Sequence, residues 1–125
     1  MKKIVLALTA VAEGLTGLLL LAWPAPVVRL LFAEEASGPG IGMSRIAGIA
    51  LIGLGIACWP RDAALQQLYG ILAYSTLAML YLIHIGIRGV PVGPLLWPGV
   101  VVHAIIVVLL VWAKWKGPRS SAAGT

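Results

Sequence analysis

Apolar residues are grouped along the chain in four long stretches, separated by short runs rich in proline, glycine and charge. The stretches cover residues 4–23, 41–59, 63–87 and 95–115. Because an α-helix rises about 1.5 Å per residue, roughly 20 apolar residues cross the ~30 Å hydrocarbon core of a bilayer. The pattern therefore predicts an all-α polytopic membrane protein. Residues 1–116 should form a single domain, in which four transmembrane helices pack as an antiparallel bundle.

The first apolar stretch does not stop at residue 23 but continues to Phe32. One straight helix over residues 4–32 would be about 43 Å long and would overshoot the bilayer. Pro24 and Pro26 lack backbone donors and disfavour helical conformation in the residues before them, so the helix should end or kink there. We expect residues 27–32 to lie along the membrane interface. Residues 117–125 are mostly small and polar and are expected to form a disordered tail.

Composition agrees with a membrane location and excludes an ordinary soluble domain. Of the 125 residues, 61% are hydrophobic and 10% are charged, and the mean hydropathy is +1.02. The net charge of +5 does not indicate nucleic-acid binding, because the basic residues stand at the ends of apolar stretches and not on one polar face. A single cysteine, Cys58, excludes a disulfide within the chain and any cysteine-based metal cluster.

Basic residues in short loops resist translocation and so set the orientation of a membrane protein. With four helices, one side holds most of them: Lys2, Lys3, Arg61, Lys114, Lys116 and Arg119. The other side holds Arg29, Arg45, Arg88, Glu34 and Glu35. Both termini are therefore expected in the cytoplasm. The start of the chain imitates a secretory signal, but cleavage after Ala12 would leave a first helix too short to span, so we expect no cleavage.

Glu13 is the most unusual residue of the predicted helices, because an ionisable side chain inside hydrocarbon costs a few kcal/mol at least. It stands halfway along the first helix, one turn from Thr9 and Thr16 and beside Gly14 and Gly17. This polar, small-residue stripe should face protein and not lipid. Two interpretations remain open: a hydrogen-bonded carboxyl group used in helix packing, or a group that handles a proton, an ion or a ligand.

Two other polar residues share the predicted depth of Glu13. His103 is near the middle of the last helix, and Tyr74 is near the middle of the third. If their helix faces meet, the three side chains can satisfy one another's hydrogen bonds, and the titrations of carboxylate and imidazole become coupled. We therefore treat Glu13, Tyr74 and His103 as a candidate intramembrane site.

The third and second helices carry further polar and small residues. On the third helix, Gln67, Tyr81, His84 and Arg88 follow the same face as Tyr74, and they indicate either an interhelical hydrogen-bond seam or the wall of a polar cavity. On the second helix, Gly48 and Gly55 are expected to allow close helix approach. Arg45, near its outer end, is expected to reach headgroups or Glu34 and Glu35, and alternatively to reach inward to Glu13.

Catalytic and cofactor motifs are absent from the sequence. It contains no Walker loop, no G-x-S-x-G, no H-E-x-x-H and no cysteine pair. Haem ligation by His84 and His103 is disfavoured, because these residues are offset by about 9 Å in depth. No ligand spacing suggests a metal site. We assign no catalytic residue, no metal and no cofactor.

The order of features resembles the small bacterial four-helix membrane proteins of the DoxX-like kind. The likeness lies in a first helix that ends at proline and in a following Gly- and Leu-rich segment, which reads RIAGIALIGLG from Arg45 to Gly55. It covers most of the chain but carries no catalytic signature. It implies a four-helix fold in the bacterial inner membrane, and some members are linked to redox enzymes or are subunits beside them.

Three functions fit these observations. The leading hypothesis is a non-enzymatic subunit or accessory protein of a larger membrane assembly, or a homo-oligomer, since four short helices leave many faces free for the bilayer or for membrane partners. The first alternative is a small oligomeric transporter or channel that uses Glu13 near the midplane. The second alternative is an enzyme or carrier for a lipidic substrate such as a quinone or isoprenoid, with Glu13 and His103 as acid and base.

Overall fold

Helices account for almost all of the regular structure of the chain. The computed structural model describes residues 1–61, 64–89 and 91–116, and within these it contains five helices and no strand. They are α1 (Lys2–Ala22), α2 (Pro24–Phe32), α3 (Gly38–Ala57), α4 (Ala64–Ile87) and α5 (Leu96–Trp115). All but α2 are long and apolar enough to cross a membrane, which confirms the predicted number of helices that could span it. The predicted disordered tail, residues 117–125, lies outside the described residues.

The four long helices, α1, α3, α4 and α5, begin and end close to their predicted limits. The clearest difference is at Gly38-Pro39-Gly40, which stands before the predicted stretch 41–59 and forms the first turn of α3. Proline is favoured in the first turn of a helix, because its missing N–H would have no partner there and its φ angle is already helical. The helix therefore starts three residues before the predicted residue 41.

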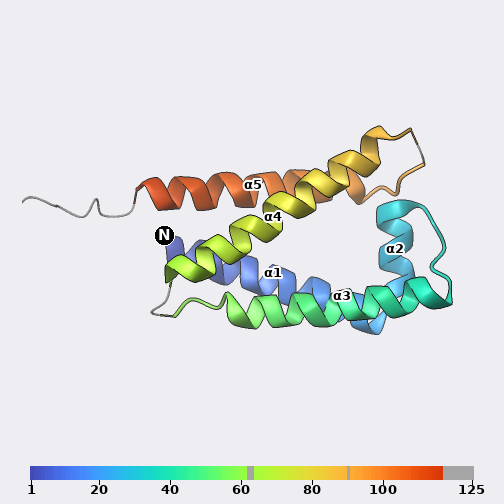
Figure 1. Cartoon of the computed structure of the whole chain (residues 1–125), viewed down its shortest axis with the longest axis horizontal. Helices are drawn as coiled ribbons and strands as arrows, with labels where there is room; N and C mark the ends of the chain where they lie inside the picture. Colours follow the sequence, from blue (N-terminus) through green and yellow to red (C-terminus); the bar gives the residue numbers. More distant parts are fainter. Residues whose placement is uncertain (62–63, 90, 117–125) are drawn as a thin grey trace, which may run out of the picture.

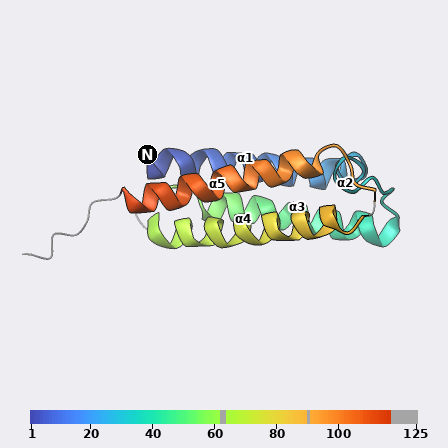
Figure 2. The same cartoon turned by 90° about the horizontal axis from the view of Figure 1, so that it is seen from above.

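The bundle is built from two pairs of helices, α1 with α3 and α4 with α5 (Figures 1 and 2). Glycine lets α1 and α3 approach closely, as predicted for Gly48 and Gly55. A Cβ atom at Gly48 would lie 2.6 Å from the carbonyl oxygen of Gly17, and one at Gly55 would lie 2.7 Å from that of Ala10. In such an interface, backbone packs directly on backbone.

The core is tightest at the end of the bundle where α1 begins and α5 ends. Figures 1 and 2 both place the N-terminus beside the end of α5. Buried apolar side chains from α1, α4 and α5 meet there with Cys58, the residue just after α3: Val5, Leu6, Cys58, Leu68, Ile71 and Leu110. The ammonium of Lys114 lies 4.8 Å from the ring centre of Tyr69, which joins the ends of α4 and α5 by a cation–π contact.

At the opposite end, α2 runs across the long axis of the other helices (Figures 1 and 2). The chain turns into it at Trp23, as the two prolines predict, and leaves it at Ala33 in a left-handed conformation with φ 55°. The connection before α5 holds α2 in place. The amide of Gly93 donates to the Leu31 carbonyl at 3.1 Å, and the amide of Leu95 donates to the Leu30 carbonyl at 2.9 Å. These bonds fix the crosswise helix to the start of α5.

Candidate functional site

Glu13 is buried in the middle of the bundle, with 5% of its surface exposed. Its position follows from α1, which packs against α3 on one side and contacts α4 and α5 on another. The carboxyl group lies within interaction range of the Tyr74 hydroxyl on α4 and of the His103 imidazole on α5. The Tyr74 and His103 rings are 6.0 Å apart between centroids, tilted by 56°. The structure thus brings together the three residues that share one predicted depth.

One nitrogen of the His103 imidazole makes a hydrogen bond, and the other has no partner among the described residues. Nδ1 lies 2.7 Å from the Gly99 carbonyl oxygen, which is an acceptor, so Nδ1 carries the proton and donates. In neutral imidazole, Nε2 is then an acceptor. It is buried and has no hydrogen-bond partner among the described residues. Because an unsatisfied buried polar atom is costly, Nε2 is a natural position for a hydroxyl or another donor to bind.

The two threonines next to Glu13 do not satisfy its carboxyl group. The Thr9 hydroxyl donates to the Val5 carbonyl, and the Thr16 hydroxyl donates to the Ala12 carbonyl, each at 2.8 Å. Such bonds to the preceding turn are the ordinary way for threonine to satisfy its hydroxyl within an apolar helix. Neither threonine hydroxyl is therefore available as a donor to the carboxyl group of Glu13.

A cavity of about 730 Å³ opens beside this cluster and extends toward α2. All five helices contribute to its lining, which is apolar except for a few groups: Thr16, Trp23, Tyr74, Tyr81 and His103. Val27, Leu30 and Leu31 of α2 line it as well. Its volume is in the range of sites for small organic ligands, about 300–1,000 Å³. The cavity therefore combines a long apolar wall with a small polar group at the level of the midplane.

The remaining polar residues of α4 do not form one continuous wall. Gln67 belongs to the α3–α4 connection, where its Nε2 donates to the Trp59 carbonyl at 2.8 Å and its Oε1 accepts from the Arg61 amide at 3.4 Å. Tyr81 lines the cavity. His84 and Arg88 are exposed near the end of α4, and no hydrogen bond among the described residues joins either to another helix. A seam running the whole length of α4 is therefore not present.

Arg45 is exposed on α3, two turns from its start. The charged and polar neighbours of Glu13 are His103 and Tyr74, so the inward reach of Arg45 to Glu13 is not seen. An exposed guanidinium near the end of a membrane helix reaches the headgroup region by extending its side chain outward.

Sequence reasoning missed the cavity itself. Its largest contributions come from ordinary leucine, valine and proline residues, which carry no chemical signal. The one available signal was the proline-induced turn into α2, because a helix that crosses the end of a bundle leaves space beneath it. Another missed feature is Ser75, which is fully buried with no hydrogen-bond partner for its hydroxyl among the described residues.

Within the described part of the chain, no three His, Cys, Asp or Glu side chains converge in a way that suits a metal ion. The chemistry available at the site is hydrogen bonding and proton exchange among a carboxyl group, a phenol and an imidazole. Comparison with protein-family models, curated proteins and solved structures found no match. The ligand class is therefore inferred from the shape and chemistry of the cavity.

Proposed function

We propose that this protein is a small integral membrane subunit or accessory protein that binds a lipidic molecule, of the quinone or isoprenoid class, in the cavity beside Glu13. The observation that carries the proposal is the polarity of the cavity, which is apolar toward α2 and has Tyr74 and His103 at its inner end. The apolar tail of such a ligand would bury its surface against this wall, which is favourable. A polar ring would find a donor and an acceptor at the same depth.

In this proposal His103, Tyr74 and Glu13 each have a different hydrogen-bonding role. The free Nε2 of His103 accepts a hydrogen bond from a hydroxyl of the ligand. The Tyr74 hydroxyl donates either to Glu13 or to a carbonyl of the ligand. Glu13 is the buried hydrogen-bond partner of Tyr74 when the cavity holds only an apolar chain.

Blocking the cavity with tryptophan at Ala78 is expected to reduce ligand occupancy by at least tenfold. Ala78 lines the cavity, whereas Ala73, on the same helix, is exposed and provides a matched control. Protein in vesicles that contain ubiquinone or menaquinone is extracted in mild detergent, and bound quinone is measured by chromatography. We expect Ala73→Trp to retain quinone like the unmodified chain. Equal retention by Ala78→Trp, or no retention by the unmodified chain, would contradict the proposal.

A transporter that uses Glu13 receives less support from the packing. A path across the membrane would have to continue past Glu13 to the end where α1 begins. That end is filled by buried apolar side chains, including Leu6, Leu68, Ile71 and Leu110, which are each 0% exposed. The buried apolar side chains at that end favour binding over passage.

We further propose that the four long helices cross a bacterial inner membrane as an antiparallel bundle with both termini in the cytoplasm. The distribution of basic residues supports this orientation, and the resemblance to DoxX-like proteins supports the location. The exposed apolar faces of α1, α3, α4 and α5 suit lipid, a membrane partner or further copies of the chain.

The orientation predicts which loops an impermeant thiol reagent reaches. In a Cys58→Ser background, Glu35→Cys should react in intact spheroplasts, because the α2–α3 connection would face the periplasm. Lys3→Cys should react only after permeabilisation. The reverse pattern would place the termini outside and overturn the orientation.

A further inference from the structure

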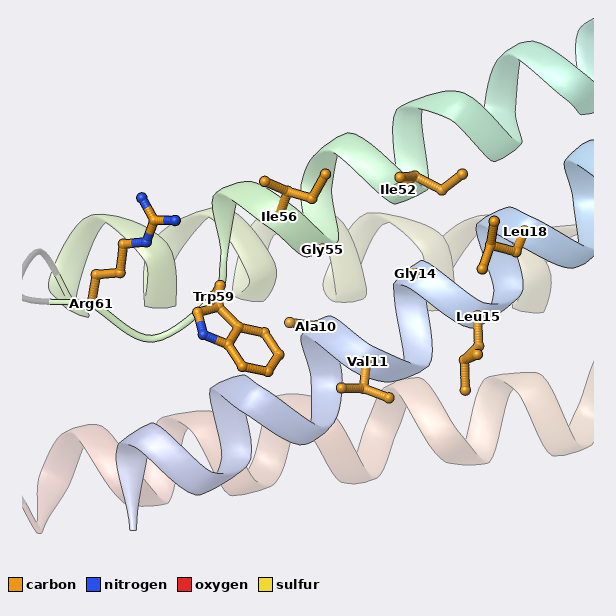
Figure 3. A pocket seen from close by; sticks show the side chains of 10 residues that line it. All are labelled: Ala10, Val11, Gly14, Leu15, Leu18, Ile52, Gly55, Ile56, Trp59 and Arg61. Atoms are coloured by element: carbon orange, nitrogen blue, oxygen red, sulfur yellow. The ribbon is translucent and has the colours of Figure 1, made fainter.

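A second hollow, of about 350 Å³, lies on the α1–α3 pair and shares no lining residue with the cavity beside Glu13. Figure 3 shows its lining: Ala10, Gly14 and Gly55 lie between the two helices, and larger apolar side chains stand along both sides. A Cβ atom at Gly14 would meet nothing within 4 Å, so this part of the hollow is open. The result is a groove that runs along the surface of the bundle.

One end of the groove has a different chemistry from the rest. Trp59 and Arg61, from the α3–α4 connection, lie at that end (Figure 3). Gln67 holds both residues through their backbones, since it donates to the Trp59 carbonyl and accepts from the Arg61 amide. The guanidinium of Arg61 is exposed. An apolar groove thus ends in an aromatic ring and a cation, at the level where a membrane helix ends.

We propose that this groove binds one acyl chain of an anionic phospholipid, whose phosphate pairs with Arg61. The α1 residues that line the groove, from Ala10 to Leu18, span about 12 Å along the helix, a length over which part of an extended acyl chain can lie. Arginine binds phosphate through paired N–H donors, and tryptophan favours the headgroup level. Size, polarity and charge therefore all match a lipid with its headgroup at the α3–α4 connection.

A second copy of the chain is a weaker match for the same groove. A protein partner would have to neutralise Arg61 at the groove end. Of the described carboxylates, Glu13 is buried in the bundle, and Glu34 and Glu35 lie beyond α2 at the other end. A lipid phosphate supplies the missing charge directly, and it is available all along the membrane surface.

Removing the charge of Arg61 tests the proposal directly. The protein is extracted from vesicles of equal phosphatidylglycerol and phosphatidylcholine, and the retained lipids and the oligomeric state are read by native mass spectrometry. We expect the unmodified chain to retain phosphatidylglycerol preferentially and Arg61→Gln to lose that preference at least fivefold. Arg88→Gln, which removes an exposed arginine from the opposite end of the bundle, is the control and should behave like the unmodified chain.

A second variant separates a specific groove from general attraction of anionic lipid to a basic protein. Gly14→Leu adds an apolar side chain within the groove, and its Cβ would meet nothing within 4 Å. A thermal unfolding midpoint equal to that of the unmodified chain would show that the fold is retained. The variant should reduce phosphatidylglycerol retention while leaving the charge unchanged. Unchanged retention in both Arg61→Gln and Gly14→Leu would overturn the proposal. Conversion of a dimer to a monomer by Gly14→Leu, with no change in lipid, would assign the groove to a second copy instead.

Discussion

Replacing Gly48 by alanine is expected to force α1 and α3 apart and to lower the thermal stability of the protein strongly. The added Cβ would lie 2.6 Å from the Gly17 carbonyl oxygen and 2.9 Å from the Leu21 amide nitrogen. Both are backbone atoms, so no side-chain rotation relieves the overlap. Overpacking typically costs about 1–3 kcal/mol, and a backbone obstacle places this variant at the upper end of that range. Since the total stability of a domain is only about 5–15 kcal/mol, the loss is large.

Gly53 provides the control for this prediction, because it lies on the same helix and a Cβ there would meet nothing within 4 Å. Gly53→Ala should fold normally and gain up to about 1 kcal/mol from helix propensity. The two variants are compared by the yield of monodisperse protein after extraction and by the midpoint of thermal unfolding. If Gly48→Ala and Gly53→Ala unfold at the same temperature, the close contact between α1 and α3 is not present in the membrane.

The helices themselves could be predicted from the sequence, because their lengths are set by a property of single residues. Apolar stretches of about 20 residues span a bilayer whatever they pack against. The turn at Trp23 and the close approach at Gly48 were also predictable, since proline and glycine act through local backbone geometry. The same reasoning was incomplete at Gly38-Pro39-Gly40, where the proline starts a helix instead of keeping the chain open.

The sequence predicts the depth of the candidate-site residues along their helices, but it does not predict how the helices enclose the site. Counting residues along a helix gives depth, because the rise per residue is constant. It placed Glu13, Tyr74 and His103 at one level, and the structure brings them together. Which helix faces meet depends on crossing angles, which are set by packing over the whole bundle.

Helical periodicity identifies residues that share a face, but it does not identify what lies opposite that face. Gln67 and Tyr81 are on the same face of α4 as Tyr74, yet Gln67 contacts the α3–α4 connection and Tyr81 lines the cavity. The difference arises because α4 packs along α5 while α1 packs along α3. The cavity beside Glu13 lies between the two pairs and extends toward α2, so the polar face of α4 meets a different environment at each level.

Replacing Gly93 by alanine is expected to release α2 from the start of α5. A Cβ atom at Gly93 would overlap the backbone carbonyl of Leu30. The overlap should break the bonds from the Gly93 amide to Leu31 and from the Leu95 amide to Leu30, each worth about 0.5–1.5 kcal/mol. Hydrogen exchange of peptides from residues 24–32 should accelerate at least tenfold, while exchange in α1 and α4 stays unchanged.

Gly89 separates this steric effect from general loosening of the same connection. Its φ angle is +73° and a Cβ there would meet nothing within 4 Å, so asparagine, which tolerates this conformation, should leave exchange in α2 unchanged. Because α2 residues line the cavity, Gly93→Ala should also lower quinone occupancy, and Gly89→Asn should not. Faster exchange in α2 with full occupancy would show that the ligand does not need α2. Unchanged exchange would show that α2 is held by contacts other than those with this connection.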